Sequence, residues 1–373
     1  MVGLGVGWRL ARAGCAVDLF DAGAAGRGAS WAAAGMLAAG VEAEPGEEAL
    51  LALNRLSQEL WPDFARGLEQ ETGLEVGLRQ EGTLVVALTR DDLAKLRFLV
   101  DFQRGLGIEL EWLSGREARA LEPSLSAAVS AAVLSRRDHQ VDNRALVAAL
   151  ASAFARAGGR LHEWTPVRAV EVEGGRAVGV RTDAGSSPAD AVLLAAGAWS
   201  RQIGGLPPEA LPPVRPIKGQ MLALGMDPAA PLLRHVLWAP KVYLVPRRDG
   251  RLLVGATVEE RGFDPALTAS GVLALLEAAW RALPAVEELP IQETWVGFRP
   301  GSPDDAPIVG PTAVEGLVVA TGHHRNGILL APITIETTTA LLLSGELHPA
   351  IRPFGPERFG RSRSGRSDQG EAS

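Results

Sequence analysis

A polar turn between an apolar strand and a helix start, at residues 316–334 (GLVVATGHHRNGILLAPIT), restricts the fold of this chain more than any other segment. The apolar run 317–320 predicts a buried strand, and Gly322 begins a turn that contains two His, one Arg and one Asn. Pro332 then lies where the first turn of a helix is expected. In α/β folds such a turn presents backbone N–H groups to a ligand. An ordinary loop is the alternative, but clustered polar side chains on a loop favour a site.

The composition indicates a globular protein of ordinary type. With 373 residues the chain predicts about two domains, and it is 47% hydrophobic and 22% charged. The net charge of −7 argues against nucleic acid or a polybasic membrane patch as a partner. Cys15 is the only cysteine, which excludes an internal disulfide framework and leaves metal binding without support. Because no membrane-spanning run or leader pattern is evident, we expect a cytoplasmic protein without stable membrane association.

The first residues have the pattern of the second half of a dinucleotide-binding βαβ unit. Residues 2–13 have helical periodicity with Gly3 on one face, and the short strand 16–20 ends in Asp21. In such a unit the acidic side chain accepts the ribose hydroxyls. Gly3 would be the third glycine of the fingerprint, so its first strand and first two glycines are expected upstream of Met1. A plain helix–turn–strand is the competing interpretation.

The rest of the chain alternates helical and strand patterns around a strand-rich block. Small residues dominate 26–40, and such residues let a backbone approach a flat ligand closely. Alternating strands fill 220–257, with an Asp249-Gly250 hairpin turn between two of them. Helices are predicted at 42–71, 90–105, 143–157 and 270–283, strands at 83–88, 167–171, 177–182 and 191–195, and a turn at 138–142.

This order predicts an α/β fold: a Rossmann-like nucleotide-binding domain, its first strand truncated, interrupted by an α+β domain with a mainly antiparallel sheet. The nucleotide-binding domain is predicted from residues 1–76, 141–216 and 300–352. The second domain is predicted from residues 77–140 and 217–299. Residues 353–373, rich in Gly, Arg and Ser at their end, are predicted to form a disordered tail.

Five motifs in this order resemble those of the FAD-dependent amine oxidases of the D-amino acid oxidase group, and within it the bacterial glycine oxidases of thiamine biosynthesis. They are GRGASWAAAGML (26–37), VYLVPR (242–247), GRLLVGAT (250–257), WVGFRPGSPDDAPIVG (295–310) and ATGHHRNGILLAP (320–332). The resemblance implies FAD as cofactor and a homo-oligomer, a tetramer in similar enzymes. Because family members carry a strand and a Gly-rich turn before the position of Gly3, it also implies that this chain is truncated and binds FAD weakly or folds poorly.

By position, the resemblance assigns residues to the cofactor and to the substrate. To FAD it assigns Gly3, Asp21, Ala22, Ala29, Ser30, Ala34, Gly35, Met36, Val167, His323, His324, Arg325, Asn326, Gly327, Ile328 and Leu329. To the substrate it assigns Arg299 for the carboxylate, Tyr243 over the amino acid, Arg325 and Met36. For both histidines we expect the backbone to matter more than the rings. Lys241 and Val258 stand beside the expected pocket, where related enzymes differ, so its size and polarity stay open.

Chemistry supports these assignments independently of the resemblance. Oxidation of an α-amino acid moves a hydride from Cα to the flavin, so the protein mainly orients the substrate and excludes water. A guanidinium is the best match for a planar carboxylate, which fits Arg299 in a strand before a Gly-Pro turn. A surface arginine and a packed sheet tyrosine are the alternatives for Arg299 and Tyr243. Because the substrate amine need only be neutral, no acid or base residue is assigned.

The resulting expectation is a glycine oxidase. Glycine, O2 and water would give glyoxylate, ammonia and hydrogen peroxide, with sarcosine or small D-amino acids as further substrates, and the imine would feed thiazole synthesis. A D-amino acid dehydrogenase that passes electrons to quinone is the alternative enzyme. An inactive, truncated flavoprotein-like binding protein is the alternative from a different class.

Overall fold

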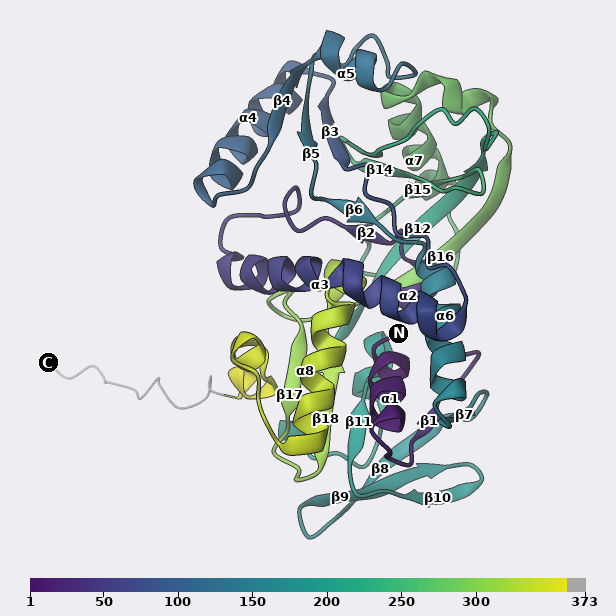
Figure 1. The fold of residues 1–373 in the computed structure, drawn as a ribbon, viewed down its shortest axis with the longest axis vertical. Helices are drawn as coiled ribbons and strands as arrows, with labels where there is room; N and C mark the ends of the chain where they lie inside the picture. Colours follow the sequence, from purple (N-terminus) through teal and green to yellow (C-terminus); the bar gives the residue numbers. More distant parts are fainter. Residues whose placement is uncertain (361–373) are drawn as a thin grey trace, which may run out of the picture.

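A computed structural model describes residues 1–360 and contains two regions that meet at a central cavity (Figure 1). The upper region in Figure 1 is built on an eight-stranded sheet in the order β16-β12-β15-β14-β13-β3-β5-β4. Its strands are β3 (Thr83–Ala87), β4 (Glu111–Ser114), β5 (Ala131–Ser135), β12 (Arg215–Gly225), β13 (Val236–Ala239), β14 (Val242–Pro246), β15 (Arg251–Gly255) and β16 (Ile291–Gly301). All neighbours in this sheet are antiparallel except β3 and β13. The expectation of a mainly antiparallel sheet is confirmed.

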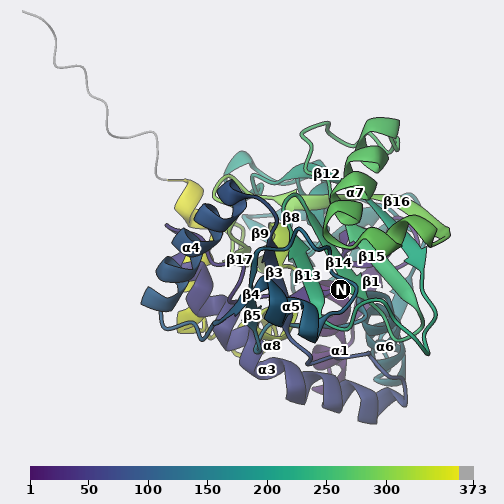
Figure 2. The same ribbon diagram turned by 90° about the horizontal axis from the view of Figure 1, so that it is seen from above.

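Three helices pack on this sheet. Helix α4 (Arg90–Gly105) contacts β3, α5 (Gly115–Leu121) contacts β4 and β5, and α7 (Ala269–Ala282) contacts β12, β14 and β15. Seen from above in Figure 2, α4 and α7 lie toward opposite ends of the sheet. The core between α7 and the strands is made of leucine and valine side chains, so the hydrophobic effect holds this region together.

The lower region is an α/β layer with short parallel strands, as predicted for the nucleotide-binding domain. Strand β1 (Asp18–Phe20) pairs parallel with β7 (Arg160–His162), and β11 (Val192–Leu194) pairs parallel with β18 (Leu317–Thr321). Strand β17 (Ile308–Pro311) lies antiparallel to β18. A separate antiparallel sheet contains β8 (Val167–Glu173), β9 (Arg176–Thr182) and β10 (Gly185–Pro188).

Long helices cover this layer and separate it from the upper sheet. Helix α1 (Val2–Arg12) packs between α6 (Asn143–Arg156) and α8 (Ala331–Ser344), while α3 (Glu48–Thr72) crosses above them in Figure 1. At the border lie α2 (Ala29–Ala32) and a two-stranded ribbon of β2 (Met36–Leu37) and β6 (His139–Gln140). Strands β12 and β16, of 11 residues each, form ten residue pairs and run between the two regions.

Three sequence expectations differ from the structure. The helix expected from residue 42 begins at Glu48, because Gly46 adopts a left-handed conformation (φ 89°) that ends the preceding turn. The turn expected at 138–142 contains the short strand β6. The disordered tail is wrong for residues 353–360, which form parts of η5 (Pro349–Phe354) and η6 (Pro356–Phe359) with Phe354 buried. The remainder of that prediction, residues 361–373, lies outside the described residues.

The domain boundaries given above stay a prediction, although the strands of the large sheet come from both segments assigned to the second domain. Among residues 1–360, none of the helices combines the length and the apolar character that crossing a membrane requires.

Candidate active site

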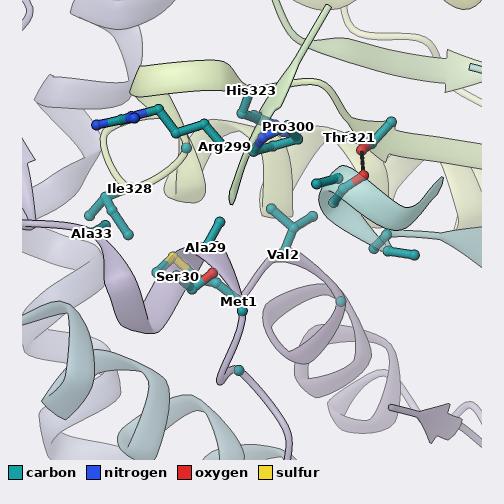
Figure 3. A pocket seen from close by; sticks show the side chains of 18 of the residues that line it. Met1, Val2, Ala29, Ser30, Ala33, Arg299, Pro300, Thr321, His323 and Ile328 are labelled. Carbon is teal, nitrogen blue, oxygen red and sulfur yellow. Dashed lines mark hydrogen bonds between the residues drawn. The ribbon is translucent and has the colours of Figure 1, made fainter. Parts of the chain in front are cut away.

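The site is a cavity of about 1710 Å³ between the two regions. Small-ligand pockets commonly measure about 300–1,000 Å³, so there is room for a dinucleotide together with a small substrate. Figure 3 shows how its walls are built: Ala29 and Ser30 of α2 lie opposite Arg299 and Pro300 of β16, with Val2 of α1 nearby. Because these elements are far apart in the sequence, the cavity exists only in the folded chain.

The structure brings most of the predicted site residues to this one cavity. Those that line it are Gly3, Asp21, Ala22, Ala29, Ser30, Ala34, Gly35, Met36, Val167, Tyr243, Arg299, His323, His324, Arg325, Gly327 and Ile328. Asn326 and Leu329 do not line it. The Leu329 side chain belongs to the helical core, and its carbonyl accepts hydrogen bonds from Ser57 and Trp61 of α3. Both residues were expected to contact the cofactor, and here the turn directs them into the protein.

Asp21 ends β1 at the lower part of the cavity. Its backbone N–H donates to the His162 carbonyl of β7, and one carboxylate oxygen accepts from the Gly23 N–H at 3.0 Å. A ribose hydroxyl needs an acceptor, and the carboxylate on the cavity wall can supply one.

The small-residue segment 29–36 forms one wall, and side chains of other elements hold its carbonyls. Asn143 Nδ2 donates to the carbonyls of Ser30 (2.7 Å) and Trp31 (3.0 Å), and Trp295 Nε1 donates to that of Ala32 at 3.0 Å. The buried Arg247 donates to the carbonyl of Ala34 at 2.7 Å. These bonds come from residues outside the cavity lining and hold the backbone of segment 29–36 in place, so its cavity side can face a flat ligand. Sequence reasoning missed Asn143, Trp295 and Arg247, although Arg247 ends the quoted motif VYLVPR.

The upper end of the cavity holds Arg299. Its guanidinium donates to the Thr257 carbonyl at 3.1 Å, and within residues 1–360 no carboxylate forms an ion pair with it. Gly219, on the neighbouring strand β12, makes room: a Cβ there would lie 2.5 Å from Nη1 of Arg299. A partly buried guanidinium without an anion, placed over a glycine in a cavity, is a suitable anchor for a substrate carboxylate. The role of Gly219 could not be read from the sequence.

Apolar and aromatic side chains surround this anchor. The Tyr243 ring lies 5.8 Å from that of Trp238, and Trp238 Nε1 donates to the sulfur of Met36 at 3.2 Å. The Tyr243 hydroxyl has the Met221 sulfur at 3.8 Å, a weak acceptor. Burial raises the pKa of Tyr243 despite the nearby Arg299, so the phenol stays protonated and can donate. All four residues line the cavity and leave space for a small substrate.

The polar turn that follows β18 contributes its backbone and one cation. Burial lowers the pKa of His323 to about 4, and its Nε2 lies 3.1 Å from Thr334 Oγ1, so a neutral ring faces α8. Burial also lowers the pKa of His324 to about 4; its Nδ1 lies 3.4 Å from Asp305. The His323 ring therefore has a hydrogen-bond partner inside the protein, whereas the buried Nδ1 of His324 forms no hydrogen bond with the described residues.

Arg325 is expected at the substrate, but the structure gives its guanidinium two carboxylate partners, Glu42 and Glu47. Glu42 lines the cavity, and burial raises its pKa to about 7 although Arg325 opposes the shift. The sequence placed Glu42 at the start of a predicted helix, 42–71, and gave no sign of its place in the cavity wall.

The residues present fit a bound FAD: a carboxylate at the ribose end, a carbonyl-anchored small-residue wall and a cavity of sufficient size. The family profile for FAD-dependent oxidoreductases (DAO) matches residues 1–341. The chain belongs to this family. FAD is therefore its cofactor, and the α/β fold with an antiparallel substrate-domain sheet is that of the family.

Several individual proteins are similar to this chain over most of its length. A glycine oxidase from Geobacillus kaustophilus is 37% identical over 361 residues, which is 96% of this chain and 94% of the relative. The crystal structure of glycine oxidase from Geobacillus kaustophilus has a TM-score of 0.88 over 96% of both chains, at 35% identity. The bifunctional protein ThiO/ThiG of Synechocystis is 39% identical over 89% of this chain, but the chain spans only 48% of that relative's length. The chain is therefore an FAD-dependent oxidoreductase that is similar to glycine oxidases and to ThiO/ThiG proteins.

Proposed function

We propose that this DAO-family protein oxidises glycine, and also sarcosine and small D-amino acids, with O2 as the electron acceptor. Glycine, O2 and water would give glyoxylate, ammonia and hydrogen peroxide. FAD, when bound, accepts the hydride from the substrate Cα and passes the electrons to O2. The observation that carries the proposal is Arg299, a cavity guanidinium without a carboxylate partner among residues 1–360, beside Tyr243.

The chain's own residues bind and orient the amino acid. Arg299 would hold the carboxylate through two parallel hydrogen bonds, and the Tyr243 hydroxyl would donate a third. Met36, Trp238 and Met221 would exclude water from the Cα and limit the size of the side chain. The amine needs only to be neutral, and we assign no acid or base residue to it.

Relatives named ThiO/ThiG support a proposal for the use of the product; the chain is 39% and 36% identical to two of them and covers about half of their length. We propose that the imine or glyoxylate supplies thiazole synthesis. A homo-oligomeric assembly likewise stays a prediction.

The test is a substrate screen on the FAD-loaded protein. Oxygen consumption and peroxide formation with glycine, sarcosine, D-alanine and D-proline are expected. Turnover with an artificial dye but without peroxide under air would instead support the dehydrogenase alternative. No turnover of any of the four would contradict the proposal.

Two variants then test the anchor. Arg299→Lys loses the bidentate geometry, and a lost hydrogen bond to a charged group corresponds to roughly 1.5–3 kcal/mol, or about 10- to 100-fold in kcat/KM. Gly219→Ala should act similarly, because its Cβ would displace the flexible guanidinium while the strands stay paired. Arg261→Lys is the control, since Arg261 is exposed and lies 3.5 Å from Glu259.

A further inference from the structure

Arg325 belongs to an ion cluster on the cavity wall. Its Nε lies 3.1 Å from Glu42 Oε2, and its Nη2 lies 2.9 and 2.6 Å from the two carboxylate oxygens of Glu47. The three side chains come from separate elements: the turn η4 (His324–Asn326), the loop before α3, and the residue preceding α3. Only 9% of the Glu42 side chain, 23% of Glu47 and 26% of Arg325 are exposed, so solvent screens the cluster weakly.

The cluster lies close to the proposed substrate anchor. Glu42 and Arg325 line the same cavity as Arg299 and Tyr243. The charge of Glu42 acts on the phenol of Tyr243, and the charges of Arg299 and Arg325 both act on His324. A substrate held by Arg299 would therefore feel the charge of this cluster.

Arg299 and Arg325, two of the six Lys and Arg residues that line the cavity, are in opposite electrostatic states. Arg299 donates to the Thr257 carbonyl and forms no ion pair with a carboxylate among the described residues, so its charge is available to an anion. Arg325 faces two carboxylates, so the cluster of one cation and two acids carries a charge of −1 when both acids are ionised. Arg299 can thus bind an anion, whereas the charge of Arg325 is neutralised by Glu42 and Glu47.

We propose that Glu42 and Glu47 set the charge selectivity of the cavity: by neutralising Arg325 they admit ligands with a single carboxylate and disfavour those with a second acidic group. The inference rests on the proposed amino acid oxidase function and deepens it, since it names amino acids without an acidic side chain as the substrate class. Glu47 does not line the cavity and would act through Arg325, as a selectivity-determining residue. Rejection of the second anion by nearby carboxylates is a repulsive element of the kind that specificity commonly needs.

The test measures binding, independently of turnover. The FAD-loaded protein is titrated with acetate and with malonate at pH 8, and the change in the flavin absorbance gives both Kd values. The wild-type protein is expected to bind acetate more tightly than malonate. In Glu47→Gln the ratio of the malonate Kd to the acetate Kd should fall at least about tenfold, because the charge of the ion cluster rises from −1 to 0.

Glu48→Gln is the matched control: Glu48 is the next residue, is exposed and bonds only to the Gly46 N–H at 3.3 Å. Its Kd ratio should equal that of the wild-type protein. Glu42→Gln is the second test variant and should shift the ratio in the same direction as Glu47→Gln. A wild-type protein that binds malonate as well as acetate would overturn the inference. So would a ratio that stays within about twofold in both test variants.

Turnover provides the second readout. In Glu47→Gln the kcat/KM for D-aspartate relative to D-alanine should rise by a similar factor. If the wild-type protein oxidises none of glycine, sarcosine, D-alanine and D-proline, the proposed function fails, while the acetate and malonate Kd values still decide the charge selectivity. The two failures are thereby distinguishable.

Discussion

Gly35 occupies a position in the cavity wall that tolerates no side chain. Its φ is 68°, and a Cβ would lie 2.0 Å from the Val141 carbonyl oxygen, which is backbone and cannot move aside. Gly35→Ala is expected to destabilise the protein by about 2–4 kcal/mol and to weaken FAD binding, because the segment must shift. Urea unfolding and a flavin titration measure the two effects.

Gly345→Ala is the control that separates the cost of a left-handed backbone from the cost of a close contact. Gly345 has a φ of 72°, but nothing lies within 4 Å of the added Cβ. The control should lose only about 1–2 kcal/mol, the cost of the left-handed conformation. An equal loss in both variants would show that the close contact with Val141 is unimportant.

The buried His323 makes stability depend on pH. The pKa of His323 is about 4 in the folded protein, against an ordinary value of 6.5. Between these two pH values the unfolded chain binds a proton at this residue and the folded protein does not. This contribution, roughly 3 kcal/mol, is complete above pH 6.5 and is lost as the pH falls toward 4. Urea unfolding at pH 7 and pH 4 should therefore show a smaller acid loss in His323→Gln than in the wild-type protein.

The exposed His348 is the comparison for this experiment. His348→Gln should keep the acid loss of the wild-type protein. If His323→Gln also keeps it, other groups cause the acid sensitivity.

At the residue scale, sequence reasoning located the groups whose chemistry is visible in their type. Arg299, Tyr243 and Asp21 stood in motifs with a family resemblance, and all three line the cavity. Gly219 and Glu42 could not be predicted, because their importance depends on which atoms lie opposite them after folding. Leu329 does not line the cavity, and its motif position does not reveal that Ser57 and Trp61 donate to its carbonyl.

At the scale of elements, Arg247 connects the end of β14 to the cavity wall. Its guanidinium donates to Ala34 O, to Gln140 Oε1 at 2.7 Å and to Asn143 Oδ1 at 3.0 Å, and the residue is 5% exposed. Arg247→Met is expected to leave these acceptors unpaired, at about 1–3 kcal/mol for each buried group. Both thermal stability and FAD affinity should fall.

Arg248→Met provides the matched control, because the Arg248 side chain is 65% exposed and its ion pair with Glu75 is long, at 4.0 Å. It should keep the wild-type melting temperature and FAD affinity. If Arg247→Met lowers stability without lowering FAD affinity, the anchoring of segment 29–36 is not what positions the cofactor wall.

Helices and strands whose own residues carry a capping motif or a hydrophobic period were predicted well. Strands that form only by pairing with a distant segment were not. Helix α4 was expected at its observed bounds, since Thr89 and Asp92 form a capping box and apolar residues repeat at helical spacing. The two-residue strands β2 and β6 exist only through their mutual pairing, which joins residues about a hundred positions apart. No local pattern predicts such a ribbon.

At the scale of the whole molecule, residues of both regions line the cavity. Ligand binding should therefore couple the stability of the lower region to that of the upper region. Cavity residues come from α1, β1 and η4 of the lower region and from β12, β14 and β16 of the upper one. A ligand that binds only the folded protein stabilises it by RT ln(1 + [L]/Kd), about 2.7 kcal/mol at a hundredfold excess over Kd. Removing FAD should therefore lower the melting temperature in a concentration-dependent way.

Hydrogen exchange with and without FAD locates this coupling. Amides in α2, in β14 and in η4 should exchange at least about tenfold more slowly with FAD, because the ligand bridges segments of both regions. Helices α5 and α7 contribute no cavity residue and should slow down less. Slowing confined to the lower region would mean that FAD leaves the substrate sheet uncoupled. The anchor at Arg299 would then be positioned by the sheet alone, through the pairing of β16 with β12.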